Sequence, residues 1–294
     1  MTLRHLNIFL CVCDENNMTK AADRLHMTQP SVSLAVQELE EHYQTLLFER
    51  LGRRLFITEA GRRLATYARH IVNLNQQTET AMRSFGLLCR LRLGASVTIG
   101  ESVLVDLLQL LQRANPQQEI FSEIHNTAEL ETMLLRDDLD LALIEGTIQS
   151  EYLISSPFMQ DELIFIAAPQ SVLSKQKKIV AADLERCKFF VREAGSGTRD
   201  LFEQVMQEQK LRFSIAGVYN NAESIKKAVA ADLGISVISQ RAVRTELARG
   251  ELCTFKLSGI AFHRTFNIVH HKNKYISPEL KAVIDLCQKT DRLQ

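Results

Sequence analysis

Apolar residues near the start of the chain recur every three or four positions, which is the spacing of amphipathic helices. The pattern predicts a helix over residues 3–13 and a second, very short one over 19–25, for which Thr19 is the N-cap candidate. After a tight turn, a third helix is predicted from Gln29 to Tyr43. Thr28 is its N-cap candidate, and a proline follows in the first turn.

The third predicted helix has one apolar face and one polar stripe. The residues expected to face the core are Val32, Ala35, Val36, Leu39 and Tyr43. At 100° per residue, the opposite side carries Pro30, Ser33, Leu34, Gln37 and Glu41. Two helices joined by a tight turn, with a small exposed polar stripe, indicate a helix-turn-helix. Periodicity alone fits an ordinary helical hairpin equally well.

A basic segment follows the third helix. Residues 48–58 hold a glycine turn between two β-rich pieces and predict a small hairpin, or wing. From residue 50 to 69 there are six arginines and one acidic residue, Glu59, in a chain whose formal net charge is zero. Clustering of one sign beside a helix-turn-helix favours contact with phosphates. The alternative is a solvated basic surface without a partner.

The last part of this region predicts a long helix that pairs with another helix. Its apolar positions alternate spacings of three and four, and they are Leu64, Tyr67, Ile71, Leu74, Thr78, Ala81, Phe85 and Leu88. Such a heptad seam favours a homodimer through this helix. Packing of the helix on its own domain is the alternative.

One set of residues in this region carries a family pattern: Phe9, Ala21, Ala22, Leu25, Thr28–Ser31, Ser33, Leu39, Glu40, Leu47, Phe48, Arg50, Arg53, Arg54 and Thr58–Gly61. It resembles the DNA-binding segment of LysR-type transcriptional regulators. The resemblance implies a winged helix-turn-helix domain at 1–58 and a dimerising linker helix at 59–90. It also implies a homotetramer of two dimers on double-stranded promoter DNA.

Two departures from the family pattern matter for DNA binding. The family usually has Leu-Gly where this chain has Tyr43-Gln44, so the third helix runs on or turns differently. It often has arginine at the place of Leu34, which can touch a thymine methyl group but cannot read guanine. The residues expected at DNA are Thr28, Gln29, Pro30, Ser31, Ser33, Leu34, Gln37, Arg50, Arg53 and Arg54. Gln29 and Ser33 are expected at base edges or phosphates, and Gln37 at a base.

Beyond residue 90, short β-rich runs alternate with helical patterns. The predicted strands lie at 96–99, 120–124, 139–144, 163–168, 189–191 and 234–238. This alternation indicates α/β domains with a mainly parallel sheet.

Three strand-to-helix turns in this half are rich in small polar residues: 95–100, 192–199 and 220–224. Helix N-termini offer free N–H groups and the positive end of the helix dipole, so such turns bind anions. Each turn alone is explained by simple helix capping, but three on one framework favour a common ligand site. The candidate effector-binding residues are Ser96, Thr98, Glu145, Arg192, Ser196, Gly197, Thr198, Asn221 and Glu223.

The same resemblance continues in the runs 91–96, 139–143, 192–199 and 269–275, which look like the effector-binding region of the subgroup that includes carbon-fixation and sulfur-assimilation regulators. It implies a fold of class α + α/β. Residues 91–294 would form two α/β subdomains of periplasmic-binding-protein type, the first of 91–162 and 267–294 and the second of 163–266. A small anionic metabolite of unknown identity would bind between them. Asn221-Ala222 replaces a common Ser-Thr pair, so the effector's identity does not carry over.

Other functions find less support in the sequence. The serines lack a nucleophile elbow, and Asp137-Asp138 are expected in a solvated turn, so no catalytic residue and no enzyme is predicted. The six cysteines show neither C-x-x-C pairs nor zinc spacing, which indicates reduced thiols in a cytoplasmic protein, although a redox-sensing cysteine stays an alternative. No metal, cofactor or membrane partner is expected. A secreted solute-binding protein would leave the first ninety residues unexplained.

Overall fold

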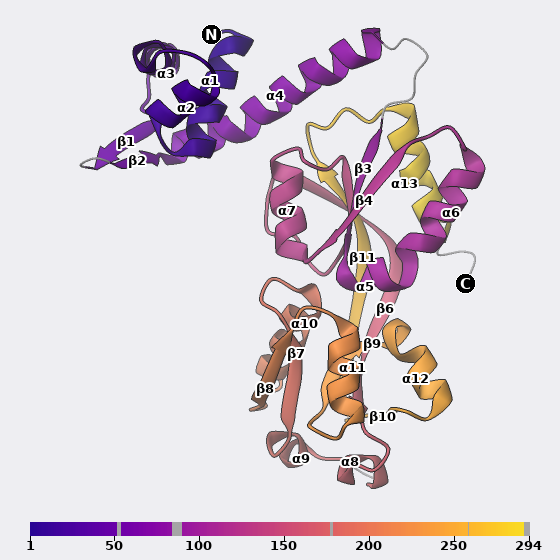
Figure 1. Ribbon diagram of the computed structural model, residues 1–294. Coiled ribbons are helices and arrows are strands. Elements are labelled where there is room, and N and C mark those ends of the chain that lie inside the picture. The colour runs from indigo at the N-terminus through magenta and orange to yellow at the C-terminus, as the bar shows by residue number, and fades with distance from the viewer. Residues whose placement is uncertain (52–53, 84–89, 177–178, 258, 291–294) are drawn as a thin grey trace. The chain divides into compact units, whose positions relative to one another are not determined.

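The computed structural model describes residues 1–51, 54–83, 90–176, 179–257 and 259–290 (Figure 1). The chain divides into two compact units. One comprises Met1–Cys89 with the short segments Leu135–Asp137 and Asn273–Tyr275, and the other comprises the remaining residues.

Three short helices build the N-terminal unit: α1 (Leu3–Glu15), α2 (Met18–Arg24) and α3 (Gln29–Tyr43). Their apolar faces meet in one buried cluster around Phe9 and Leu39, neither of which is exposed. The prediction of three helices, including the bounds of the third, is confirmed.

Two local predictions for these helices are wrong. The N-cap of α2 is Asn17 rather than Thr19, because the Asn17 side-chain oxygen accepts hydrogen bonds from the backbone N–H groups of Thr19 and Lys20. Tyr43 does not face the core but is 40% exposed, because it lies in the last turn of α3, beyond Leu39, the last buried position of that helix.

Side chains fix the end of α3 where the family pattern has glycine. Gln44 adopts the left-handed conformation with φ of 52°, and its side-chain amide donates to the Glu41 carbonyl at 2.6 Å. The Glu40 carboxylate accepts hydrogen bonds from the backbone N–H groups of residues 47 and 48 at 2.7 and 3.2 Å. The helix therefore stops without a glycine, although a side chain in this conformation costs about 1 kcal/mol or more.

The predicted hairpin is present as β1 (Phe48–Leu51) and β2 (Arg54–Ile57), which pair antiparallel. Its turn, residues 52–53, lies outside the described residues. The hairpin follows α3 directly along the chain, as a wing does in the predicted class of domain.

The long helix α4 (Glu59–Arg83) begins after Thr58, whose hydroxyl accepts a hydrogen bond from the Gly61 backbone N–H at 2.9 Å. Its first turns belong to the core of the N-terminal unit, in which Ala65 and Ala68 are buried. Farther along, Ile71 and Leu74 of the predicted seam are exposed in the single chain. Positions 85 and 88 of that seam lie outside the described residues.

The second unit is built from strands that alternate with helices. Its strands are β3 (Leu91–Ser96), β4 (Ile120–His125), β5 (Leu141–Glu145), β6 (Leu153–Ala167), β7 (Lys188–Arg192), β8 (Ser214–Tyr219), β9 (Ser236–Ser239), β10 (Cys253–Phe255) and β11 (Phe262–His271). Its helices are α5 (Val97–Ile99), η1 (Gly100–Leu104), α6 (Val105–Ala114), α7 (Thr127–Leu135), α8 (Val172–Lys175), α9 (Ala181–Glu185), α10 (Gly197–Glu208), α11 (Ala222–Ala230), η2 (Gln240–Val243), α12 (Arg244–Arg249) and α13 (Pro278–Thr290).

The main sheet is mixed, so the prediction of a mainly parallel sheet is wrong. Its strand order among the described residues is β10-β6-β11-β5-β3-β4, and β9 also pairs with β6. β3 pairs parallel with β4 and β5, but every pairing of β6 and β11 is antiparallel. The alternation of side chains along β6 and β11 has the same period in parallel and antiparallel sheets, so it did not indicate their direction.

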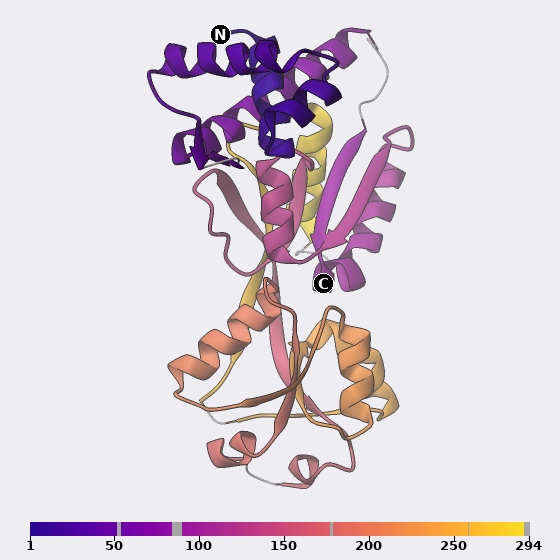
Figure 2. The same ribbon diagram turned by 60° about the vertical axis from the view of Figure 1, so that its left-hand side comes forward.

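β6 and β11 run through both subdomains of this unit (Figures 1 and 2). One hydrophobic core lies around Leu93, Leu143 and Phe266, and another around Phe189 and Phe202. The two cores are thus joined by a pair of continuous strands.

Two further predictions in this half are wrong. Val97–Ile99 are helical, and the strand is Leu91–Ser96, because the apolar run continues past Ser96, which ends the strand and occupies the N-cap position of the next helix. Asp137 is not in a solvated turn but is buried, with the Lys274 ammonium 2.7 Å from its carboxylate. That partner is 137 residues away in the sequence, so no local pattern indicates it. Asp138 is exposed as predicted.

Candidate functional site

The predicted groove-facing residues lie in the first three turns of α3 or immediately before them: Thr28, Gln29, Pro30, Ser31, Ser33, Leu34 and Gln37. Leu34 is 55% exposed, so its side chain is accessible on this face of α3. Thr28 occupies the N-cap position, but its hydroxyl bonds the Ser31 hydroxyl at 2.8 Å and does not cap the backbone. The backbone N–H groups at the start of α3 therefore receive no side-chain cap from Thr28.

Two arginines of the basic segment are paired with acidic residues, so fewer guanidinium groups are available to phosphates than the composition indicates. Arg69 is paired with Asp14 at 2.7 Å, and Arg62 is paired with Glu59 at 3.1 Å. In the hairpin, the backbones of Arg50 and Arg54 are described but their side chains are not, and Arg53 lies outside the described residues. The predicted DNA contacts of these three wing arginines stay predictions.

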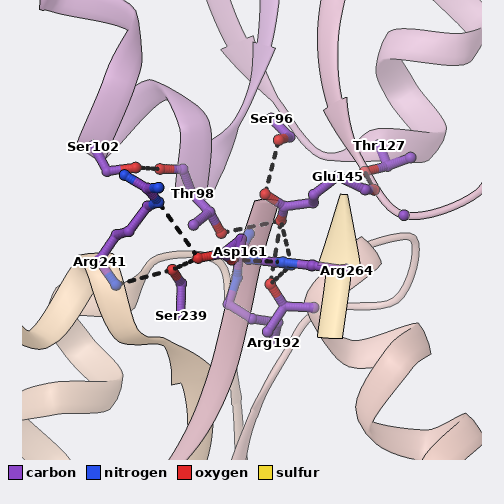
Figure 3. Close-up of polar contacts among 12 residues, drawn as sticks. Ser96, Thr98, Ser102, Thr127, Glu145, Asp161, Arg192, Ser239, Arg241 and Arg264 are labelled. Carbon is purple, nitrogen blue, oxygen red and sulfur yellow. Dashed lines mark hydrogen bonds and ion pairs between the residues drawn. The ribbon is translucent and has the colours of Figure 1, made fainter. Parts of the chain in front are cut away.

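In the second unit, the carboxylate of Glu145, at the end of β5, accepts hydrogen bonds from several hydroxyl groups, among them those of Ser96 and Thr98 (Figure 3). Ser96 donates to one carboxylate oxygen at 2.9 Å. Thr98 and Thr198 donate to the other at 3.1 and 3.2 Å. The Glu145 side chain is only 2% exposed, so these hydroxyls replace its hydration.

Arg264 on β11 joins this carboxylate to a second one. Its Nε donates to Asp161, its direct cross-strand partner on β6, at 2.8 Å. Its Nη1 donates to the Thr198 hydroxyl at 2.9 Å and lies 3.5 Å from Glu145. Ser239 donates to the other Asp161 oxygen at 2.8 Å, which fixes the acid independently of Glu145. We name Ser96, Thr98, Glu145, Asp161, Thr198, Ser239 and Arg264 the Glu145 network.

The start of α10 approaches this network closely. A Cβ atom on Gly197 would lie 2.3 Å from the Glu145 carbonyl oxygen, so only glycine lets the helix begin directly against β5. Ser196, at the N-cap, makes no side-chain capping bond.

Two buried hydrogen-bond donors at this place are unused. Among the described residues, the Ser196 hydroxyl and Nη2 of Arg264 have no partner, and Ser196 is 1% exposed. Buried polar groups without partners cost about 1–3 kcal/mol each, and they are uncommon in folded proteins.

The structure brings four of the nine predicted effector residues into one network, namely Ser96, Thr98, Glu145 and Thr198. Ser196 and Gly197 lie beside it at the start of α10.

The remaining three have other partners. Arg192 makes two hydrogen bonds to Glu193 at 2.8 and 2.9 Å. Asn221 caps α11 by accepting from the Ser224 backbone N–H, and Glu223 pairs with Lys226.

Burial raises the pKa of Glu101 in η1, against the effects of Arg192 and of the Ala222 backbone N–H.

Sequence reasoning missed Arg264, Asp161 and Ser239. A signal for the first two was present, because strand side chains alternate between faces with a period of two. Arg264 falls in phase with the buried Phe262 and Phe266. Asp161 likewise falls in phase with the buried Leu163. A charged residue in the buried phase of a strand needs a partner, and each of these two is the other's partner.

Burial disfavours the thiolate form of each described cysteine. All five are free thiols, and burial raises the pKa of each, to about 12 for Cys13 and Cys287. Reactive cysteines instead have lowered pKa values. Cys89 lies outside the described residues.

A helix-turn-helix unit followed by a two-subdomain α/β unit with a buried polar network defines a class of protein, the DNA-binding regulators that carry a ligand-binding domain. Residues 3–62 match the bacterial regulatory helix-turn-helix protein, lysR family, and residues 87–292 match the LysR substrate binding domain. The chain therefore belongs to the LysR family of transcriptional regulators.

Relatives of the chain match along nearly its whole length. The uncharacterized HTH-type transcriptional regulator YeiE of Escherichia coli is 32% identical, over 98% of this chain and 97% of that protein. CysL of Bacillus subtilis is 32% identical, over 90% and 89%. The RuBisCO operon transcriptional regulator of Allochromatium vinosum is 32% identical, over 96% and 94%. The predicted likeness to carbon-fixation and sulfur-assimilation regulators is confirmed by these names.

Solved structures show the same fold. A full-length variant of OxyR from Pseudomonas aeruginosa has a TM-score of 0.68 and 24% identity, covering 100% of this chain and 95% of that one. The regulatory domain of Synechocystis PCC6803 CcmR in complex with 2-PG has a TM-score of 0.65 and 24% identity, covering 69% and 97%. Full-length CbnR complexed with its target DNA has a TM-score of 0.62 and 19% identity, covering 99% and 100%. Within the described residues, no helix is both long and apolar enough to cross a bilayer.

Proposed function

We propose that the chain binds double-stranded promoter DNA through the start of α3 and the β1–β2 hairpin. We also propose that a small anionic metabolite, bound beside the Glu145 network, changes that binding. The proposal needs no cofactor besides this effector. CcmR, whose regulatory domain has this fold, is known in complex with 2-PG, and CbnR in complex with DNA.

The observation that carries the effector proposal is the pair of unused donors, the Ser196 hydroxyl and Nη2 of Arg264. Ser196 is the N-cap residue of α10, a helix of 12 residues whose positive dipole end favours an anion, and Arg264 on β11 contacts Thr198 in the first turn of that helix. A ligand with oxygen acceptors would satisfy both donors and remove the cost of leaving them unpaired. Since α10 and β5 belong to different subdomains, such a ligand would favour one arrangement of the two.

Thermal unfolding of the full chain with a panel of small anionic metabolites tests this proposal. A ligand at about 100 times its Kd stabilises the folded state by about 2.7 kcal/mol, which raises Tm by about 5–11 °C in a unit of this size. Ser196→Ala should reduce the shift without lowering the stability of the free protein, because it removes an unpaired donor. Ser214→Ala, at an exposed position of β8, is the matched control. A hit that shifts Ser196→Ala as strongly as the wild type would contradict this placement.

The DNA half of the proposal has its own readout. Fluorescence anisotropy with promoter fragments should show sequence-preferring binding, and the hit from the screen should change the apparent Kd. Binding without sequence preference, with or without ligand, would refute the regulatory function.

We further propose a homodimer through α4, and a homotetramer of two such dimers. Ile71 and Leu74 are exposed positions of the heptad seam, and the same helix of a second copy would cover them. Analytical ultracentrifugation should show that Leu74→Glu dissociates the dimer, whereas Gln76→Glu at a neighbouring exposed position should not. An unchanged mass for Leu74→Glu would exclude this interface.

A further inference from the structure

The Glu145 side chain is held in the manner of a bound ligand. Both of its oxygens are used, by three hydroxyl groups at 2.9, 3.1 and 3.2 Å, and a guanidinium nitrogen of Arg264 lies 3.5 Å away. Ser96 and Thr98 flank the strand-to-helix turn after β3, and Thr198 lies in the first turn of α10. Hydroxyls at helix starts together with an arginine are the donors that proteins use for free carboxylates and phosphates.

The donors come from both subdomains, while the carboxylate comes from one. Ser96 and Glu145 end the paired strands β3 and β5, and Thr98 lies in α5, which follows β3 directly (Figure 3). Thr198 belongs to α10 of the other subdomain. Arg264 keeps its orientation without Glu145, because Asp161 holds its Nε at 2.8 Å. The donor set would thus persist if the Glu145 carboxylate were removed.

We propose that Ser96, Thr98, Thr198 and Arg264 form a carboxylate-binding site that the chain's own Glu145 occupies, and that this internal ligand holds the two subdomains together. The site takes a carboxylate no larger than the side chain that fills it. An external anion must therefore bind beside Glu145, at the unused donors, or displace it. The inference does not depend on the identity of the external effector.

Glu145→Ala tests the site by replacement, because the atoms that this substitution removes are those of an acetate ion. Tm of the full-chain variant is measured at pH 7 in sodium acetate, against sodium chloride of equal ionic strength. We expect acetate to raise Tm of the variant by about 3–6 °C at about ten times its Kd, and to leave the wild type unchanged.

Size and charge give the internal controls. Formate should stabilise the variant less than acetate does, because it leaves part of the space empty. Propionate should be excluded by the remaining Cβ atom, and neutral acetamide should not replace the charge opposite Arg264. Glu151→Ala, at an exposed position of the same unit, is the matched variant and should not respond to acetate. A Glu145→Ala protein that gains no more from acetate than the wild type would overturn the proposal.

Glu145→Gln decides the question if Glu145→Ala does not fold, because it keeps the side-chain volume while it removes the charge and turns one acceptor oxygen into a donor. Hydrogen exchange should accelerate at the first turn of α10 and along β11 near Arg264, relative to the wild type and to Glu151→Gln. Unchanged exchange there would show that the carboxylate does not hold the subdomains together. Since neither test uses the effector, both can fail while the effector screen succeeds, and the reverse.

Discussion

Arg264→Met is the substitution that most directly tests the energetics of the buried network. It keeps the length of the side chain and removes the cation that lies 2.8 Å from Asp161 and 3.5 Å from Glu145. The Arg264 side chain is buried, as are both carboxylates, so water cannot take its place without opening the structure.

The expected loss is large because the buried Glu145 carboxylate loses the guanidinium that lies 3.5 Å away, and Asp161 is left with the more distant Arg241 at 3.7 Å. Removing one partner of a buried ion pair costs about 3–5 kcal/mol. In a unit of roughly 200 residues, each kcal/mol shifts Tm by about 2–4 °C, so Tm should fall by about 6–20 °C.

Circular dichroism melting of the full chain at pH 7 measures this fall in the Tm of the second unit. Arg249→Met is the matched control, because Arg249 is 67% exposed and its partner Glu251 is 3.9 Å away. That change should cost less than about 0.5 kcal/mol. Adding Asp161→Leu to Arg264→Met should recover part of the loss, since apolar residues can replace a buried ion pair. If Arg264→Met melts within about 2 °C of the control, the network does not carry the stability assigned to it.

Three further changes test other parts of the molecule. Leu34→Arg should change the preferred operator in a binding-site selection while leaving Tm unchanged, and an identical preferred sequence for both proteins would show that Leu34 does not lie in the groove. Gln44→Gly should raise the stability of the N-terminal unit by about 0.5–1 kcal/mol in urea melts, because glycine adopts a φ of 52° without strain, and a loss of stability would contradict this. In a Cys89→Ser background, the native protein should react slowly with Ellman's reagent at pH 8, because burial raises the pKa of Cys13 and Cys287 to about 12, and one fast-reacting thiol would revive the redox alternative.

Local patterns predicted the parts of the fold that local physics determines. The bounds of α3 follow from the spacing of Val32, Val36 and Leu39, and Ser96 and Thr198 stood out as small polar residues at predicted turns. The partner of Glu145 on β11 could not be found in this way, because Arg264 is separated from Glu145 by more than a hundred residues of sequence. The relative direction of the long strands could not be predicted either, because side chains alternate with a period of two in parallel and antiparallel sheets alike.

The continuous pairing of β6 with β11 has a mechanical consequence. The subdomains are joined by a hydrogen-bonded ribbon instead of by slack loops, so any rotation of one against the other has to twist that ribbon. The register shifts between Phe266 and Asn267, which leaves Phe158 as an extra residue on β6 and gives the ribbon a bulge, with its local bend and stronger twist, close to Arg264. A ligand that rotates one subdomain against the other would change the twist of the ribbon and store elastic energy in it. That energy would favour the original arrangement of the subdomains once the ligand dissociates.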